Sequence, residues 1–217
     1  MPEWVKCFFF ELFHASKHLV EKKGNMPLNF SIILSSVREK SQGTKAAKFI
    51  LNKCLERGYN VTLINPKEYN LPLLDKMYKE YQKGSAPESL EKLHNILSGS
   101  DGFIIVTGEY NHTLPPALTN LMDYFREEYF FKPAAVASYS GGPIAGMRSA
   151  IQAKIFLGEL GIVTTKTMFG IPNIQSAFDP KGEPVDESFH AKVKRFLDEL
   201  EWYASALKEA RAKGVPF

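Results

Sequence analysis

Short apolar runs alternate with longer amphipathic stretches along most of the chain. The runs are short, continuously apolar and bounded by polar residues, a pattern that predicts five β-strands, most of them buried on both faces. They lie at residues 30–34, 61–64, 102–106 and 134–137, with a weaker run at 162–169. The longer stretches repeat apolar residues at helical spacing and predict helices. These lie at residues 44–57, 87–97, 116–129, 143–160 and 187–213.

This regular alternation of strands and helices indicates an α/β fold with a parallel sheet. Right-handed crossovers between parallel strands place helices on both faces, which is the doubly wound architecture. Five such strands fit the flavodoxin-like order 2-1-3-4-5. In that order strands 1 and 3 are neighbours whose connections leave in opposite directions, so a crevice opens at their carboxyl ends. We therefore expect one flavodoxin-like domain at residues 30–217, with a ligand site at that crevice.

Residues 1–29 fall outside the alternation. Their apolar block begins at Trp4, but Lys6, Glu11 and His14 interrupt it well before the roughly 20 residues that span a bilayer. We predict an N-terminal helical extension over residues 1–29 that packs on the domain or on a second subunit. Contact of residues 1–23 with a membrane surface and a disordered extension are the less favoured alternatives.

Composition limits the classes of partner. The chain has 217 residues, of which 44% are hydrophobic and 24% charged, enough for a full-sized core. Its 27 basic and 24 acidic residues give a net charge of +3 and are scattered, so we expect no nucleic-acid partner. Cys7 and Cys54 alone provide neither a zinc cage nor a disulfide framework. We therefore expect a cytoplasmic protein without a metal site.

The first polar loop, residues 35–44, has the composition of a phosphate site. It combines hydroxyls, an arginine and a glycine directly before a predicted helix start. Helix N-terminal amides and hydroxyls donate to phosphate oxygens, and a guanidinium balances their charge. Neither G-x-G-x-x-G nor G-x-x-x-x-G-K-[ST] is found, so a monophosphate suits the loop best. Alternatively, Ser41 or Thr44 only caps the helix and Arg38 is a solvated side chain.

Two further loops suggest that a flat ring binds beside this phosphate. Glu109, Tyr110 and Asn111 follow a buried strand, and a tyrosine offers a π-face while amides donate to ring carbonyls. The paired glycines Gly141 and Gly142 allow a ring to lie against main chain. A flat ring and one phosphate together describe flavin mononucleotide (FMN). The alternative for Tyr110 is that it fills a gap under its loop.

Three blocks of sequence give the chain a resemblance to the NADPH-dependent FMN reductase family, a flavodoxin-like group that includes flavin, chromate, azo and quinone reductases. The first is S-x-R-x-x-x-x-G from Ser36 to Gly43. The second is E-Y-N-x-[ST]-x-P-x-x-L-x-N-x-x-D from Glu109 to Asp123. The third has paired glycines, a further glycine, an arginine and a glutamine between Ser138 and Gln152. Three positions depart from the family pattern: Ser35 replaces a glycine, Gly108 a proline and Pro116 a glycine.

The resemblance implies where FMN binds. The phosphate would lie against the first loop, and the isoalloxazine and ribityl chain against the second and third. The residues of the first group are Ser36, Arg38, Ser41, Gln42, Gly43 and Thr44. Those of the second are Thr107, Gly108, Glu109, Tyr110, Asn111, Ser140, Gly141 and Gly142.

The resemblance also implies an NAD(P)H-dependent oxidoreductase in which the flavin carries the chemistry. A hydride would pass from NADPH, or NADH, to FMN N5. After NADP leaves, a quinone, flavin or similar small-molecule acceptor would take the electrons at the same place, in a ping-pong mechanism. No catalytic side chain is required, with Tyr110 and His112 as candidate contributors. The alternative is a non-catalytic FMN-binding electron carrier or redox sensor, although carriers of this fold are strongly acidic.

Aromatic residues crowd the end of one predicted helix. Tyr124, Phe125 and the run from Tyr129 to Phe131 exceed what one amphipathic stripe needs. A homodimer or dimer of dimers, the usual state of the resembling family, would bury them, and core packing is the alternative. Arg148 could reach a pyridine-nucleotide phosphate or a partner subunit, or it could form a surface ion pair.

Overall fold

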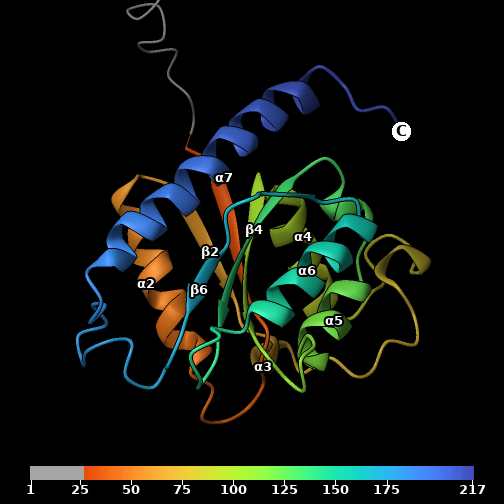
Figure 1. Cartoon of the computed structure of the whole chain (residues 1–217). Helices are drawn as coiled ribbons and strands as arrows, with labels where there is room; N and C mark the ends of the chain where they lie inside the picture. Colours follow the sequence, from red (N-terminus) through yellow and green to blue (C-terminus); the bar gives the residue numbers. More distant parts are fainter. Residues whose placement is uncertain (1–26) are drawn as a thin grey trace, which may run out of the picture.

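The computed structural model describes residues 27–217 (Figure 1). The predicted extension over residues 1–29 lies almost wholly outside these residues. The strands are β1 (Asn29–Leu34), β2 (Asn60–Ile64), β3 (Gly102–Gly108), β4 (Pro133–Tyr139), β5 (Val163–Thr164) and β6 (Phe169–Ile171). The α-helices are α2 (Gly43–Glu56), α3 (Pro66–Tyr69), α4 (Glu88–Gly99), α5 (Pro116–Asp123), α6 (Met147–Glu159) and α7 (Ser188–Ala212). Short 3-10 turns lie at Tyr78–Glu80 and Glu127–Tyr129.

The sheet is parallel and has the predicted order, β2-β1-β3-β4-β5. Strand β1 pairs with both β2 and β3, with Phe30 opposite Gly102, and β4 continues the sheet with Ala134 opposite Phe103. Strands β3 and β4 are buried along their whole length, as their continuous apolar runs predicted. The flavodoxin-like fold class is thus confirmed.

The weak run at residues 162–169 is not one strand. Strands β5 and β6 both pair with β4, and residues 165–168 leave the sheet between them. The backbone N–H groups of Lys166 and Thr167 donate to the Glu199 carboxylate of α7, at 2.7 and 2.9 Å, instead of continuing the ladder. A charged partner far away in the sequence therefore divides the strand.

Two helices are shorter than their patterns predicted. Helix α6 starts at Met147 rather than at residue 143, because Ala145 and Gly146 have left-handed φ angles of 58° and 70° that no α-helix accepts. Helix α5 ends at Asp123, and the Arg126 N–H donates to the Glu128 carboxylate at 3.0 Å rather than to a preceding helical carbonyl. The other three predicted helices agree with the structure to within two residues.

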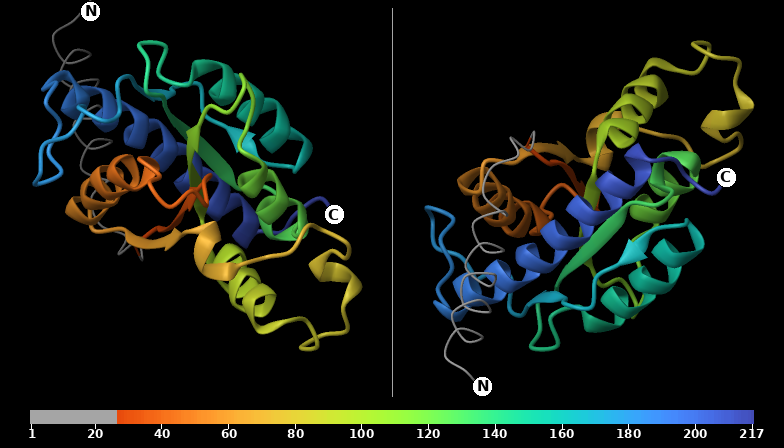
Figure 2. Two further views of the ribbon diagram at one scale, coloured as in Figure 1. Left: turned by 90° about the horizontal axis from the view of Figure 1, so that it is seen from below. Right: turned by 90° about the horizontal axis from the view of Figure 1, so that it is seen from above.

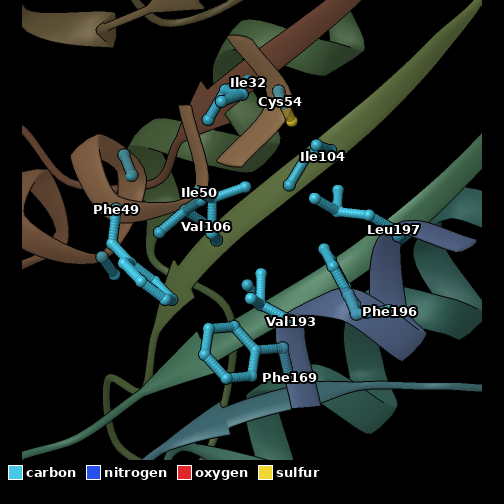
Figure 3. Packing of buried hydrophobic residues seen from close by; sticks show 14 of the residues in the cluster. Ile32, Phe49, Ile50, Cys54, Ile104, Val106, Phe169, Val193, Phe196 and Leu197 are labelled. Carbon is cyan, nitrogen blue, oxygen red and sulfur yellow. The ribbon is translucent and has the colours of Figure 1, made fainter. Parts of the chain in front are cut away.

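Helices cover both faces of the sheet and enclose two cores. Helices α2 and α7 cover one face, where Phe49 of α2 and Phe196 of α7 meet Phe169 of β6 (Figures 1 and 3). Helices α4, α5 and α6 cover the other face, and the two end-on views in Figure 2 show the sheet between these layers. Each fully buried large apolar side chain contributes about 1.5–3 kcal/mol. These cores fix the strands whose carboxyl ends carry the polar loops.

The crowded aromatics divide between core and surface. Tyr124, Phe125 and Tyr129 are buried in the second core, so core packing accounts for them. Phe130 and Phe131 are half-buried and contact Phe217 near the C-terminus. The homodimer stays a prediction. Among the helices of residues 27–217, none has the length and apolarity needed to cross a membrane.

Candidate functional site

The three polar loops meet at the carboxyl edge of β1, β3 and β4 and line a cleft of about 290 Å³. Nine of the predicted site residues line it: Ser36, Arg38, Ser41, Gln42, Gly108, Glu109, Tyr110, Ser140 and Gly141. Four lining residues were not predicted: Lys40, Tyr139, Ile174 and Gln175. The remaining predicted residues lie beside or behind the cleft wall: Gly43, Thr44, Thr107, Asn111 and Gly142.

The first loop turns directly into helix α2. The Ser41 N–H donates to the Arg38 carbonyl at 3.1 Å, and the Gly43 N–H donates to Ser41 Oγ at 3.4 Å. Within residues 27–217, the N–H groups of Gln42 and Thr44 have no hydrogen-bond acceptor. The positive end of α2 therefore presents unbonded amides at this loop.

Charge at the first loop suits a phosphate dianion. Arg38 and Lys40 both line the cleft and supply two positive charges beside the amides of α2. Ser36 and Ser41 add hydroxyl groups. The Thr44 hydroxyl instead donates to the Ser41 carbonyl at 3.3 Å, so it supports the turn and does not line the cleft.

The second loop is a two-residue hairpin turn. The N–H groups of Tyr110 and Thr113 each donate to the other residue's carbonyl, at 3.1 and 2.9 Å. Asn111 and His112 between them have φ angles of 49° and 65°, as the tight primed turn requires. Gln152 of α6 holds the turn from outside, because its Nε2 donates to the His112 carbonyl at 2.9 Å and its Oε1 accepts from the Thr113 hydroxyl.

Glu109 ties the same loop to the start of α6. Its carboxylate accepts from the Arg148 backbone N–H at 3.2 Å and from the Arg148 guanidinium at 2.9 Å. Burial tends to raise the pKa of Glu109, but the hydrogen bonds and charge of Arg148 outweigh it, so the pKa is lowered. The Glu109 carboxylate is thus ionised and paired with Arg148. Of the roles considered for Arg148, the structure shows the ion pair.

Tyr110 joins the second loop to the first. Its hydroxyl lies 2.7 Å from Ser36 Oγ, and the Arg38 guanidinium carbon lies 6.0 Å from its ring centroid. The half-buried ring therefore forms one wall of the cleft beside the phosphate loop. Thr107 lies behind this wall, where its buried hydroxyl bonds the Gly108 carbonyl at 2.9 Å and Ser149 at 3.0 Å.

The third loop is held by the segment after β6. The Ile174 N–H donates to the Ser140 carbonyl at 3.0 Å, and the Asn173 N–H donates to the Gly142 carbonyl at 3.2 Å. A Cβ at Gly141 would lie 2.8 Å from Gln175 Nε2, so the glycine leaves room for the Gln175 amide against this loop. This contact brings Ile174 and Gln175 into the cleft.

Sequence reasoning missed the four extra residues for different reasons. Lys40 stands inside the recognised first loop but outside its motif positions. Tyr139 is the last residue of β4 and lies between two conspicuous serines. Ile174 and Gln175 follow β6, a strand that the sequence did not separate from β5. Only the position of Tyr139 at a strand end carried a signal.

A doubly wound parallel sheet of this order, with a polar cleft at the switch point between β1 and β3, is the architecture of the flavodoxin-like class. The residues fit FMN: the amides of α2 with Arg38 and Lys40 suit its phosphate, and Tyr110 with Gly141 suits a flat ring. The chain belongs to the NADPH-dependent FMN reductase family, whose model matches residues 28–176.

Individual relatives agree with this assignment. A quinone reductase from Escherichia coli K12 is 30% identical over 130 residues, covering 56% of this chain and 67% of the relative. A quinone reductase from Pseudomonas putida is 26% identical over 190 residues, covering 84% and 96%. Among solved structures, the flavoenzyme FerB, an NAD(P)H:(acceptor) oxidoreductase from Paracoccus denitrificans, has a similar fold. Its TM-score is 0.66 at 24% identity, and the match covers 81% of this chain and 98% of FerB.

Family membership makes the protein an oxidoreductase with FMN as cofactor and NAD(P)H as hydride donor. The predictions of the family, of an enzyme and of these cofactors are confirmed. The contacts of individual residues with FMN remain predictions.

Proposed function

We propose that this protein catalyses the NADPH-dependent two-electron reduction of a quinone or another flat acceptor, such as a flavin or an azo dye, by a ping-pong mechanism. Bound FMN would supply the redox chemistry of hydride transfer, and the protein would bind and orient it. The relatives named quinone reductase support the choice of acceptor class. Another relative, an NADPH azoreductase from a Bacillus species, is 26% identical over 125 residues, covers 57% of this chain and 68% of the relative, and supports the wider range.

The observation that carries the proposal is that basic residues, an aromatic ring and a glycine line one cleft. Arg38 and Lys40 would hold the phosphate, and Tyr110 and the exposed Gly141 would border the ring of FMN. With FMN in this cleft, one slot at the ring would remain for both donor and acceptor. Donor and acceptor would have to use that slot in turn, which is the condition for a ping-pong mechanism.

The chain's own groups would orient the ring and stabilise its reduced form. Within residues 27–217, the N–H groups of Gly141 and Gly142 donate to no acceptor. Reduction places negative charge near N1 and C2=O of the isoalloxazine. Preorganised amides aimed at such a charge stabilise it without reorganisation. We infer that this glycine pair supplies those donors and that Tyr110 is the ring platform.

Steady-state kinetics with NADPH and 1,4-benzoquinone test the proposal. FMN-loaded protein should bleach in the visible on anaerobic addition of NADPH and recover its colour on addition of the quinone. Double-reciprocal plots at several quinone concentrations should give parallel lines, and intersecting lines would refute the ping-pong mechanism. Flavin that binds but is reduced by neither NADPH nor NADH would instead favour the electron carrier. Comparison of kcat/KM for benzoquinone, riboflavin and an azo dye ranks the acceptors.

A further inference from the structure

Tyr139 forms the floor of the cleft between the first and second loops. It is the last residue of β4 and stands opposite Gly108 in the sheet. A Cβ at Gly43 would lie 2.6 Å from the Tyr139 hydroxyl oxygen, and a Cβ at Gly108 would lie 3.1 Å from it. The phenol therefore fills the space that two glycines leave, against the first turn of α2.

Two serines surround the Tyr139 hydroxyl. Ser35 Oγ accepts from the Gly108 N–H at 3.0 Å, and Ser41 Oγ accepts from the Gly43 N–H at 3.4 Å. Each serine thus uses a lone pair on an amide and keeps its own proton for a further acceptor. Both serine hydroxyls lie close enough to the Tyr139 phenol to lower its pKa.

Within residues 27–217, the Tyr139 hydroxyl donates no hydrogen bond. Burial raises the pKa of Tyr139 and outweighs the effect of the nearby Ser41 and Ser35 hydroxyls, which lower it. The phenol therefore keeps its proton at neutral pH. Within residues 27–217, no carbonyl or carboxylate accepts it. Because Tyr139 lines the cleft, its donor is available to a ligand there.

We propose that the Tyr139 hydroxyl donates a hydrogen bond to the phosphate of FMN. The inference rests on FMN binding in this cleft, with its phosphate at the amino end of α2. That end carries unbonded amides and the cations Arg38 and Lys40, so an anion is the acceptor best suited to complete the site.

The same geometry explains two departures from the family pattern. Ser35 stands where the family has glycine, and it accepts from the N–H of Gly108, which stands where the family has proline. A proline at position 108 has no N–H to donate and would place ring atoms against the Tyr139 phenol. Ser35, Gly108 and Tyr139 are thus mutually dependent features of this chain's phosphate site.

The test compares the binding of FMN and riboflavin, which differ by the phosphate, to wild type and to Tyr139→Phe. Quenching of flavin fluorescence gives each Kd without NADPH. A hydrogen bond to a charged group predicts that Tyr139→Phe weakens FMN binding roughly ten- to a hundredfold. Riboflavin binding should change less than about twofold on the same reasoning.

Tyr129→Phe is the matched control. Tyr129 is wholly buried in the other core beside Phe103, at the amino end of β3, and its hydroxyl has no partner within residues 27–217. The Tyr129→Phe variant should bind FMN and riboflavin with the Kd values of wild type. Equal weakening of FMN and riboflavin by Tyr139→Phe would overturn the phosphate contact in favour of a ring or ribityl contact. Unchanged Kd values for both flavins would show that Tyr139 only fills space.

A second readout covers the case in which Tyr139→Phe perturbs the fold. The ³¹P resonance of bound FMN should shift between wild type and Tyr139→Phe if the phenol contacts the phosphate, and an identical shift would contradict the inference. Circular dichroism establishes whether the variant is folded. If wild type binds FMN but does not oxidise NADPH, the proposed reaction is refuted, while the binding comparison still tests the Tyr139 contact. Failure of the proposed function and failure of this inference can therefore be distinguished.

Discussion

Removing the side chain of Gln152 is predicted to weaken FMN binding through the hairpin turn of the second loop. Gln152 bonds the His112 carbonyl and the Thr113 hydroxyl from outside the turn. Within the turn, Asn111 and His112 both adopt left-handed backbone conformations. Such a conformation costs a non-glycine residue about 1–2 kcal/mol, less for asparagine. The two bonds from Gln152 therefore offset a local strain of similar size.

The magnitude follows from the exposure of these bonds. Both involve solvent-exposed groups, so each is worth about 0.5 kcal/mol, the lower end of the range for hydrogen bonds. Their combined loss of about 1 kcal/mol corresponds to a roughly fivefold increase in the Kd for FMN. Relaxation of the turn would also move Tyr110 away from Ser36, where it now forms the cleft wall.

The assay combines flavin-fluorescence titration with hydrogen exchange. Gln152→Ala should raise the Kd about fivefold and accelerate exchange of the Tyr110 and Thr113 amides, which close the turn. Adding His112→Gly should recover much of the affinity, because glycine adopts the left-handed conformation without strain. Gln82→Ala is the control, since the Gln82 side chain makes no hydrogen bond within residues 27–217. An unchanged Kd and unchanged exchange in Gln152→Ala would refute the reasoning.

Two other substitutions test the packing and the charge of the site. Gly43→Ala would place a Cβ 2.6 Å from the Tyr139 hydroxyl and should lower the free energy of unfolding in urea by about 1–3 kcal/mol. A Cβ at Gly99 would meet no atom within 4 Å, so Gly99→Ala should not lower the free energy of unfolding. Equal unfolding free energies for the two variants would contradict the overpacking at Gly43. Because the folded-state pKa of Glu109 is lowered chiefly by Arg148 against the effect of burial, Glu109→Gln should destabilise the protein by up to about 1 kcal/mol at pH 7. The difference in unfolding free energy between wild type and Glu109→Gln should persist above about pH 4 and vanish as the pH falls through the folded-state pKa. Urea denaturation at pH 7 and at pH 3 measures it, and equal differences at the two pH values would argue against this ion pair.

The order of the sheet could be predicted because its central strands carry their own signal. Residues 102–106 and 134–137 are apolar without interruption, and burial on both faces is the physical cause of that pattern. The division between β5 and β6 had no such signal, since it depends on the Glu199 carboxylate of a distant helix. Long-range polar contacts of this kind leave no local periodicity.

The candidate site shows the same limit. Loops at strand ends could be located because an apolar run stops and polar or small residues follow. The cleft floor could not, because Tyr139 reaches it only by packing into the space beside Gly43 of α2 and Gly108 of β3. Gln175 likewise enters through its contact with Gly141. Predicting either residue requires knowing which glycines face each other across the sheet edge.

The three sequence blocks of the family act as one physical unit in this chain. Arg148 and Gln152 stand one turn apart on α6, so both face the second loop, where they hold Glu109 and the turn at His112. The second loop in turn bonds the first, through the hydroxyls of Tyr110 and Ser36. Arg148 and Gln152 of the third block therefore shape the cleft without lining it. We therefore expect a substitution in one block to displace the other two.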